Sequence, residues 1–454
     1  MFRNLVLAAL IIGVTTLTSL ASSYEKLDSM LTPEQAKSDI KQWTDFIEKT
    51  HPDLAYTTED TKGLSDNITK FSNSISQPIS VRDFWLEMML FNRQISDGHV
   101  SLTPPKVFDM AEEYLLAGGV MFPFEVVFDD EQLIIKEQLD GKPAKLAGYA
   151  ITEINGKSIE AILKPLLERT HGDSDNQRKA VLAPRFAVYY WLYFGEVKRF
   201  KMDVIKDNVA LQNVDVVGGT KLARSDKSFE EKFKFRVLNN DTALLTINTF
   251  TWREDEQMVF DFFAASFEKI KAQKLTHLLI DIRKNGGGDD QIWMKGILPY
   301  IADKPWRTGS NYKVKILAGS EDEGETAGDV VAGEINKMQK VDTDNLLKFT
   351  GEVSVLVGPY TYSSSILFMN VMQDYGFGKL VGDRTGGKSG QTGGTQKQIL
   401  SNSGLFTVSP RFWLARPKGG ENLELVKLDT IINYDPTQPD QLIDKLIARH
   451  NSSI

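Results

Sequence analysis

Apolar and polar positions in the C-terminal half of the chain switch between strand and helix patterns. Residues 353–358 form a short apolar, β-branched run, which is typical of a strand buried on both faces of a parallel sheet. Residues 361–365 supply hydroxyl groups where a helix begins, and the apolar segment 366–375 ends at glycines. A second apolar run starts at Lys379. The pattern predicts a strand, a helix and a parallel strand, with both strands ending at one edge of the sheet.

Two side chains that could carry chemistry fall at this edge, Ser363 at the predicted helix start and Lys388 after the second strand. A helix N-terminus has unbonded backbone N–H groups, which could hold an oxyanion beside a serine nucleophile. A lysine can act as a neutral base if burial lowers its pKa. These residues leave two interpretations open: catalysis by Ser363, or a capping serine near a solvated lysine.

The rest of the chain divides into regions of different patterning. Residues 22–106 are mainly helical, and residues 107–218 carry short β patterns with an Ile-Asn-Gly turn that resembles a PDZ domain, a module that captures extended peptides. Residues 219–454 return to alternating strands and helices. Within them, 275–283 is a buried-strand pattern that runs into three adjacent glycines, which allow close backbone approach to a ligand. We predict a multi-domain α/β protein.

Composition excludes several classes of function. The formal net charge of −8 makes nucleic acid an improbable partner, and the absence of cysteine excludes thiol catalysis, zinc–thiolate sites and disulfides. The five histidines show no paired metal-ligand spacing, so we expect neither a metal nor another cofactor in catalysis. His277 lies inside a strand pattern and is expected to be structural.

The N-terminus indicates export. Residues 1–21 combine an early arginine, an apolar run and a small-x-small cleavage pattern, so we interpret them as a removed signal peptide; a retained anchor is the alternative. No later stretch is long and apolar enough to span a membrane. The mature protein is therefore expected to be exported and soluble, either secreted or, in a Gram-negative source, periplasmic.

Three segments in order, 279–288, 361–376 and 381–388, resemble the C-terminal processing (tail-specific) peptidases and their tricorn-type relatives, which are serine peptidases. The resemblance covers most of the mature chain. It implies a helical N-terminal module, a PDZ-like domain over 107–218 and, over 219–454, a crotonase-like α/β peptidase core with a mostly parallel sheet.

The resemblance also assigns site residues. Ser363 matches the nucleophile, and the amides of Ser364 and Gly287 match the oxyanion hole. Two bases occur in the family: a lysine at the position of Lys388, and in tricorn-type members a histidine at the position of His99. We rank His99 first, because an imidazole has a pKa of about 6.5 and needs less adjustment than a lysine to accept protons at neutral pH.

Tricorn-type members add a carboxylate late in the chain, for which Glu421 is the nearest match. The spacing there is off by one residue, which leaves Glu424 as the alternative. Ile366 also replaces the glutamate that usually follows the serine motif.

The resulting hypothesis is an exported serine endopeptidase that acts on polypeptides without a metal or cofactor. The alternative is a non-catalytic protein of the same fold that binds peptides or small hydrophobic ligands. The substrate and the oligomeric state stay open.

Overall fold

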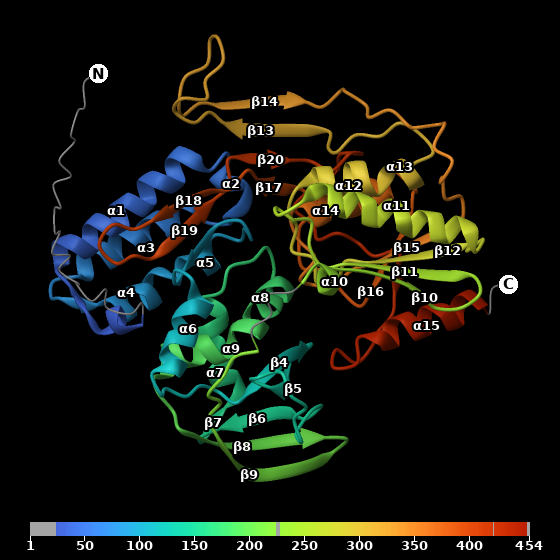
Figure 1. Ribbon diagram of the computed structural model, residues 1–454. Helices are drawn as coiled ribbons and strands as arrows, with labels where there is room; N and C mark the ends of the chain where they lie inside the picture. The colour runs from blue at the N-terminus through green and yellow to red at the C-terminus, as the bar shows by residue number, and fades with distance from the viewer. Residues whose placement is uncertain (1–23, 224–227, 421, 452–454) are drawn as a thin grey trace, which may run out of the picture.

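The computed structural model describes residues 24–223, 228–420 and 422–451. The predicted signal peptide, 1–21, lies outside the described residues. Among the helices that are described, none has the length and apolar character needed to cross a membrane. Figure 1 shows a central sheet with helices on both faces, next to N-terminal helices and a second sheet that contains β4 to β9.

The central sheet has six strands and carries the predicted strand, helix and strand. Its order is β10 (Phe233–Val237), β11 (Thr242–Ile247), β12 (His277–Asp281), β15 (Glu352–Leu356), β16 (Lys379–Gly382) and β21 (Thr430–Ile431). Only β10 runs antiparallel to its neighbour, and every other pairing is parallel. The prediction of an α/β core with a mostly parallel sheet is confirmed.

Alternate residues of these strands face different helices. Leu245 and Ile280 point into a core covered by α11 (Glu256–Ala272), α12 (Asp290–Gly296), α13 (Leu298–Ile301) and α14 (Ser364–Tyr375). Leu244 and Leu279 point to the opposite face, where α15 (Asp440–Asn451) packs on them. Figure 1 shows α15 on the other side of the sheet from α11 and α12. The short α10 (Phe229–Lys232) leads into β10. Apolar side chains at successive positions of the strands thus bury both faces of the central sheet.

The N-terminal region is helical, as predicted. Its elements are η1 (Glu25–Asp28), β1 (Met30–Leu31), α1 (Pro33–Thr50), α2 (Leu54–Thr57), α3 (Thr61–Ser74), β2 (Ile79–Ser80), α4 (Val81–Met88) and α5 (Phe91–Gln94). Helix α1 begins at Pro33 after a capping box at Thr32, whose side chain accepts from the Gln35 amide. The strand β3 (Ser101–Thr103) follows the last helix and ends this region.

Residues 107–218 contain an antiparallel sheet with more helix than the short β patterns predicted. The sheet runs β4 (Phe124–Asp129), β5 (Gln132–Gln138), β6 (Ala150–Ile154), β8 (Arg199–Lys206) and β9 (Val209–Val217), with β7 (Lys157–Ser158) paired to β6. The helices are α6 (Val107–Leu116), α7 (Ile159–Glu168), α8 (Asp175–Leu182), η2 (Ala183–Arg185) and α9 (Phe186–Phe194). The predicted Asn-Gly turn is present, with positive φ at Asn155 and Gly156.

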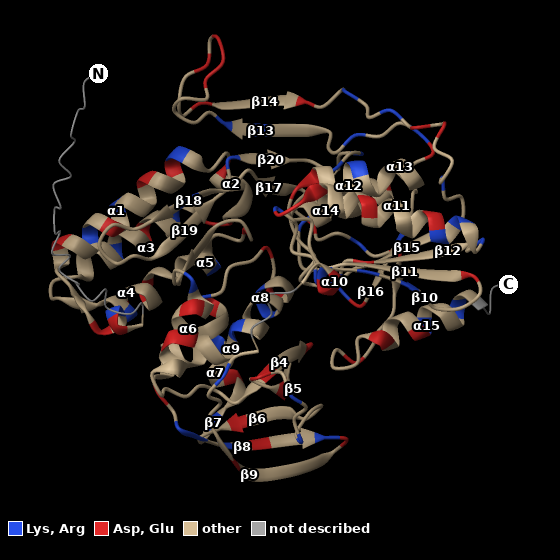
Figure 2. Cartoon of the chain, in the orientation of Figure 1, with Lys and Arg blue, Asp and Glu red and all other residues tan. Residues whose placement is uncertain are grey.

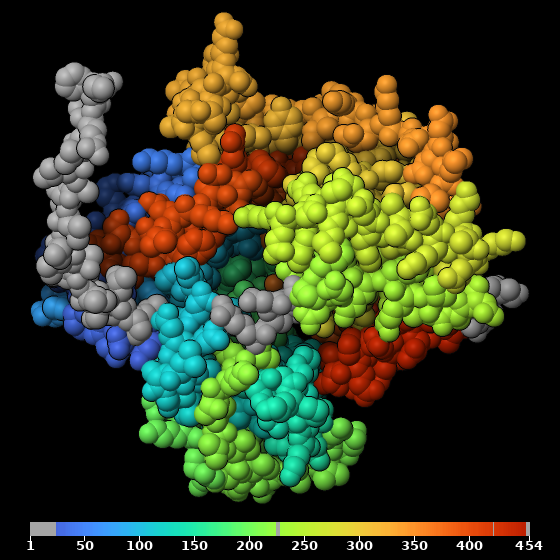
Figure 3. Space-filling model, viewed as in Figure 1, coloured from blue at the N-terminus to red at the C-terminus, as the bar shows by residue number. Residues whose placement is uncertain are grey.

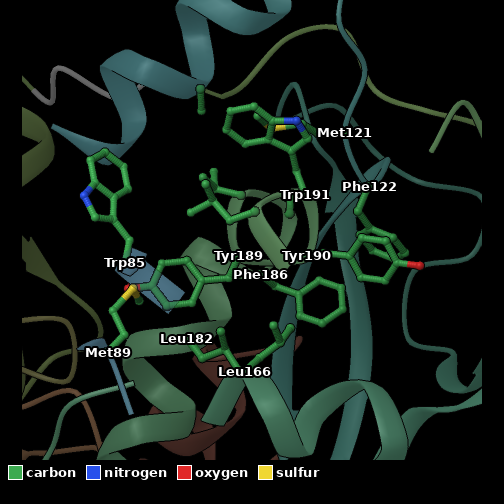
Figure 4. Packing of buried hydrophobic residues seen from close by; sticks show 14 of the residues in the cluster. Trp85, Met89, Met121, Phe122, Leu166, Leu182, Phe186, Tyr189, Tyr190 and Trp191 are labelled. Carbon is green, nitrogen blue, oxygen red and sulfur yellow. The ribbon is translucent and has the colours of Figure 1, made fainter. Parts of the chain in front are cut away.

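The helical region and residues 107–218 share one hydrophobic core. Trp85 of α4 belongs to the same buried cluster as Phe186 and Trp191 of α9 (Figure 4). Leu400 and Leu405, from far along the chain, complete that cluster. The predicted boundary near residue 106 therefore does not separate two independently packed cores.

The C-terminal half sends two hairpin systems back to the N-terminal region. Strands β18 (Gln396–Ile399) and β19 (Phe406–Ser409) form a sheet with β3. Strands β14 (Val330–Glu334), β13 (Asn311–Lys315), β20 (Phe412–Leu414) and β17 (Gln391–Gly393) form another. Figure 2 shows that acidic and basic residues are interspersed along α1, α11 and α15. Figure 3 shows the regions packed around the centre of the molecule, where the surface is hollowed.

Candidate active site

Ser363 stands between β15 and α14 in an unusual backbone conformation. Its φ of 57° and ψ of −127° lie where residues with a Cβ are rarely found. It occupies the N-cap position of α14, yet its side chain makes no capping hydrogen bond. The capping interpretation of Ser363 is therefore not supported, and the hydroxyl is directed elsewhere.

That hydroxyl faces the imidazole of His99. The distance from Ser363 Oγ to His99 Nε2 is 2.9 Å, and the imidazole ring lies against the ring of Tyr362, with centroids 4.8 Å apart. His99 comes from the loop between α5 and β3, so two residues that are 264 positions apart in the sequence meet at this point. The pair has the distance needed for proton transfer between a nucleophile and a base.

A hydroxyl and a carboxylate determine which imidazole nitrogen carries the proton. Thr392 Oγ1, on β17, donates to Asp97 Oδ1 at 2.8 Å and lies 3.0 Å from His99 Nδ1. Because the threonine proton is used toward Asp97, Thr392 Oγ1 accepts from His99 Nδ1–H. The lone pair of Nε2 is then free to accept the proton of Ser363.

Asp97 is the buried anion at the end of this chain of hydrogen bonds. It also accepts from the His99 backbone amide at 2.7 Å, and His51 Nε2 lies 3.4 Å from its other oxygen. Burial alone would raise the pKa of Asp97, but the hydrogen bond and charge of His51, together with His99, lower that pKa to about 2. The carboxylate is thus charged at neutral pH and stabilises an imidazolium.

The pKa of His99 is shifted below its ordinary value. Burial of the ring lowers it, and the negative charges of Asp97 and Asp173 oppose the shift without cancelling it. At neutral pH the imidazole is therefore uncharged, which is the form that can act as a base.

Lys388 lies near this loop but makes other contacts. Its Nζ donates to the backbone carbonyl of Ser96 at 2.7 Å, and its backbone amide donates to Asp173 Oδ2 at 2.9 Å. Within the described part of the chain, the structure gives no hydrogen bond between Lys388 and Ser363. These contacts suit a lysine that holds the loop before His99 in place.

Asp173 joins three loops of the site and was missed by the sequence analysis. Its carboxylate accepts from the Gly98 amide at 2.8 Å and from the Tyr362 hydroxyl at 2.8 Å, in addition to the Lys388 amide. Burial and the charge of Asp97 raise the pKa of Asp173, while Lys388 and the backbone donors lower it. Its sequence surroundings are ordinary, and no local motif identifies it.

The glycine turn lies against the nucleophile, as predicted. Gly287 has φ of 106°, and a Cβ there would come within 2.6 Å of Ser363 Cβ, so only glycine fits. Its amide, however, donates to Asn285 Oδ1 at 2.9 Å. Ser364, the first residue of α14, and Gly288 both line the cavity. Ser364 thus borders the cavity at the start of α14, whereas the Gly287 amide is engaged inside the turn.

The predicted late carboxylates are not beside His99 in the described residues. Glu421 itself lies outside them. Glu424 pairs with Lys427 at 2.5 Å, and its side chain is 46% exposed. The position beside His99 Nδ1 is held by Thr392, backed by Asp97, which departs from the expectation for Glu424.

Ser363 and His99 open into a cavity of about 540 Å³ formed by all three regions. His171, in the loop between α7 and α8, and Arg185, at the end of η2, contribute to it. Burial, and next the charge of Arg185, lower the pKa of His171 to about 3, so this ring is neutral. The complete lining is Gly98, His99, His171, Gln177, Val181, Arg185, Gly286, Gly288, Asp290, Tyr360, Tyr362, Ser363, Ser364, Leu367, Gln391, Thr392, Gly393, Gly394, Thr395 and Phe412.

Solved structures share this fold. Mature CPAF complexed with lactacystin superposes with a TM-score of 0.65 at 13% identity, covering 92% of this chain and 98% of that one. Mature CPAF alone gives 0.64 at 13% identity, with 92% and 97% covered. The photosystem II D1 C-terminal processing protease gives 0.48 at 12% identity, with 90% and 96% covered. At such identities the CPAF likeness shows the fold alone.

Part of the core also matches a known protein family by sequence. Residues 241–426 match the model of peptidase family S41, a segment that includes Ser363, Lys388 and the glycine turn, but neither His99 nor Asp173. On this match, residues 241–426 are a peptidase family S41 domain, and the chain is a serine peptidase.

Proposed function

We propose that this peptidase is an exported endopeptidase in which Ser363 is the nucleophile and His99 is the general base. The observation that carries the proposal is the 2.9 Å contact between Ser363 Oγ and His99 Nε2, made by a serine whose hydroxyl is not used for capping. Lys388, bonded to the Ser96 carbonyl, is assigned a positioning role instead.

The chemistry follows from the hydrogen bonds. Ser363 Oγ attacks the carbonyl carbon of a peptide bond as its proton passes to His99 Nε2. Thr392 and Asp97 stabilise the resulting imidazolium from the Nδ1 side. His99 then gives the proton to the departing amine, and a water molecule activated by the same nitrogen releases the acyl group from Ser363. No metal is needed for these steps.

Orientation of the base is assigned here to Thr392 and Asp97. Both are buried and in contact with His99 through Nδ1 or its backbone amide. Glu421 stays a prediction for this role. The oxyanion is assigned to the Ser364 amide together with an amide of the 286–288 turn. Gly287 can serve only if its amide exchanges Asn285 for substrate; Gly288 borders the cavity directly.

A fluorophosphonate probe tests the proposal directly. Such probes react with activated serines, so the wild-type chain is expected to be labelled on Ser363, and Ser363→Ala is expected to remain unlabelled. Ser365→Ala is the matched control, since Ser365 is fully buried beside the site and should leave labelling unchanged. Because mature CPAF is known complexed with lactacystin, lactacystin is a second probe, expected to compete with labelling. Labelling that persists in Ser363→Ala would overturn the assignment of Ser363 as the nucleophile, and a folded wild type that is never labelled would favour the non-catalytic alternative.

A further inference from the structure

Two histidines and a glutamate meet near the N-terminal ends of two central strands, at the opposite end of the sheet from Ser363. His277 is the first residue of β12, Glu352 is the first residue of β15, and His450 lies in the last turn of α15. One nitrogen or oxygen of each lies within 4.8 Å of the others. The register pairs His277 with Glu352 on adjacent parallel strands, so both side chains project from the face that α15 covers.

The two imidazoles have buried nitrogens without hydrogen-bond partners. His277 is only 1% exposed; its Nε2 lies 3.1 Å from Ser354 Oγ, but its Nδ1 is buried and unpartnered. His450 Nε2 is buried and likewise has no hydrogen-bond partner. Buried polar atoms are normally satisfied, and an unmet one calls for an explanation such as a bound ion. The buried, unpartnered Nδ1 of His277, within a cluster of three possible ligand residues, points to a bound ion.

Carboxylates supply the negative charge that a cation requires. Glu352 Oε2 lies 3.5 Å from His450 Nδ1, while its other oxygen accepts from Lys379 Nζ at 3.1 Å. Asp241 Oδ2 lies 4.0 Å from His450 Nε2. The cluster thus offers imidazole nitrogens and the glutamate oxygen that Lys379 does not use, and a second carboxylate borders it. This donor set suits Zn²⁺ and similar transition metals rather than Ca²⁺ or Mg²⁺, which take oxygen ligands.

The spacing is close to that of a bound ion. Ligand atoms at about 2.0–2.2 Å from a tetrahedral Zn²⁺ lie roughly 3.4 Å from each other. The distance from Glu352 to His450 already matches this value, and the largest separation in the cluster exceeds it by about 1.4 Å (4.8 − 3.4). The rings stack at 4.3 Å with 29° between planes, which keeps their nitrogen-bearing edges together. A rotation of His450 at the end of α15 can close the remaining gap.

We propose that His277, Glu352 and His450 bind one divalent transition-metal ion, with Asp241 or water completing its coordination. The ion fastens α15 to the central sheet and plays no part in peptide cleavage, since it lies at the opposite ends of the strands from Ser363. No sequence motif indicates the site, because its ligands come from two strands and a distant helix.

Zn²⁺ binding to the full chain tests the site. The protein carries Ser363→Ala to prevent self-cleavage, has no polyhistidine tag and is stripped with a chelator that is then removed. Calorimetry is expected to show one Zn²⁺ per chain, and Zn²⁺ is expected to raise the melting temperature by several degrees, whereas Mg²⁺ is not. His450→Gln and Glu352→Gln are each expected to weaken binding by more than about 10-fold.

Matched controls separate this site from others. Glu334→Gln changes an exposed glutamate on β14, and His171→Gln changes a histidine of the active-site cavity; both are expected to bind Zn²⁺ like the parent. The proposal is overturned if the parent shows no saturable binding, if His450→Gln and Glu352→Gln both bind like the parent, or if binding is lost in His171→Gln. Circular dichroism of each metal-free variant verifies folding, and if one ligand variant fails to fold, the other decides.

Discussion

The Asp173 carboxylate accepts a hydrogen bond from the Lys388 backbone amide at 2.9 Å, and this contact connects the region 107–218 to the loop that follows β16. The same carboxylate holds the Gly98 amide, next to the proposed base, and the Tyr362 hydroxyl, next to the proposed nucleophile. The relative position of Ser363 and His99 therefore depends on an acidic residue that contacts neither reacting atom.

Asp173→Asn is expected to lower kcat by about 10-fold or more and to reduce the melting temperature, because an amide cannot accept from all three donors and leaves a buried donor unmet. Asp175→Asn is the matched control. Asp175 lies two residues on, its side chain is 62% exposed, and it pairs with Arg93 and Arg178 rather than with the backbone of Gly98 or Lys388, so activity should be unchanged. Equal activity of both variants in steady-state assays would show that Asp173 does not position the site.

His99→Ala and Lys388→Ala distinguish the two candidate bases. His99→Ala is expected to lower kcat about as far as Ser363→Ala, because members of a nucleophile–base unit fail together. Lys388→Ala removes one hydrogen bond to the Ser96 carbonyl and should cost about 1 kcal/mol of stability with a much smaller loss of kcat. The measurement is kcat for variants confirmed to be folded. A dead Lys388→Ala enzyme beside an active His99→Ala enzyme contradicts the assignment.

The pH profile of kcat/KM provides an independent check. His99 must be neutral to act as a base, and its pKa is lowered by burial from its ordinary value of about 6.5. Activity is therefore expected to be full at neutral pH and to fall only on acidification below about pH 6.5. A lysine base would give activity that keeps rising at alkaline pH until its amine loses a proton.

Thr392→Val tests the hydroxyl that links His99 to Asp97. Valine keeps the shape but cannot accept from His99 Nδ1, so the imidazolium loses its link to the carboxylate. We expect kcat to fall by about 10-fold to 100-fold with little change in KM, since the lost interaction strengthens only as charge develops. Thr392→Ser should restore most of the activity. A Thr392→Val enzyme with wild-type kcat would contradict the proposal that Thr392 links His99 to Asp97.

Ser363→Gly should be more stable than Ser363→Ala. Both variants lack the nucleophile, but only glycine adopts φ of 57° with ψ of −127° without steric cost. The difference is expected to be about 1–2 kcal/mol in the free energy of unfolding, measured by denaturant titration. Equal stabilities would mean that the surrounding structure relaxes to relieve the strain when the side chain is removed.

The sequence analysis was most successful where chemistry and local pattern coincide. The mostly parallel sheet followed from apolar runs such as 353–358, and the start of α14 followed from the hydroxyl residues 361–365; the role of Ser363 stays a proposal. His99 came from the family resemblance. The structure places it 2.9 Å from Ser363, and its role as the base stays a proposal. The helices in 107–218 were underestimated because α9 is buried on nearly all sides, so it shows no amphipathic period.

Other parts of the site could not be predicted because their roles exist only in three dimensions. Asp173, Thr392 and His51 are ordinary residues locally, and each becomes relevant through a partner far along the chain. The Gly287 amide was assigned to the oxyanion from a motif, whereas the bond to Asn285 that occupies it depends on the shape of the turn. A motif identifies the residue types of a site, but the three-dimensional packing determines which of their atoms can contact a substrate.

Strand β3 pairs with β19, so the segment just after His99 is completed by residues 406–408. During synthesis the N-terminal half emerges first, but this pairing cannot form until nearly the whole chain has left the ribosome. Thr392, which is proposed to orient His99, is also synthesised late. During synthesis, His99 is therefore present before Ser363 and Thr392 can lie beside it, so the proposed catalytic pair is expected to assemble only when synthesis is almost complete.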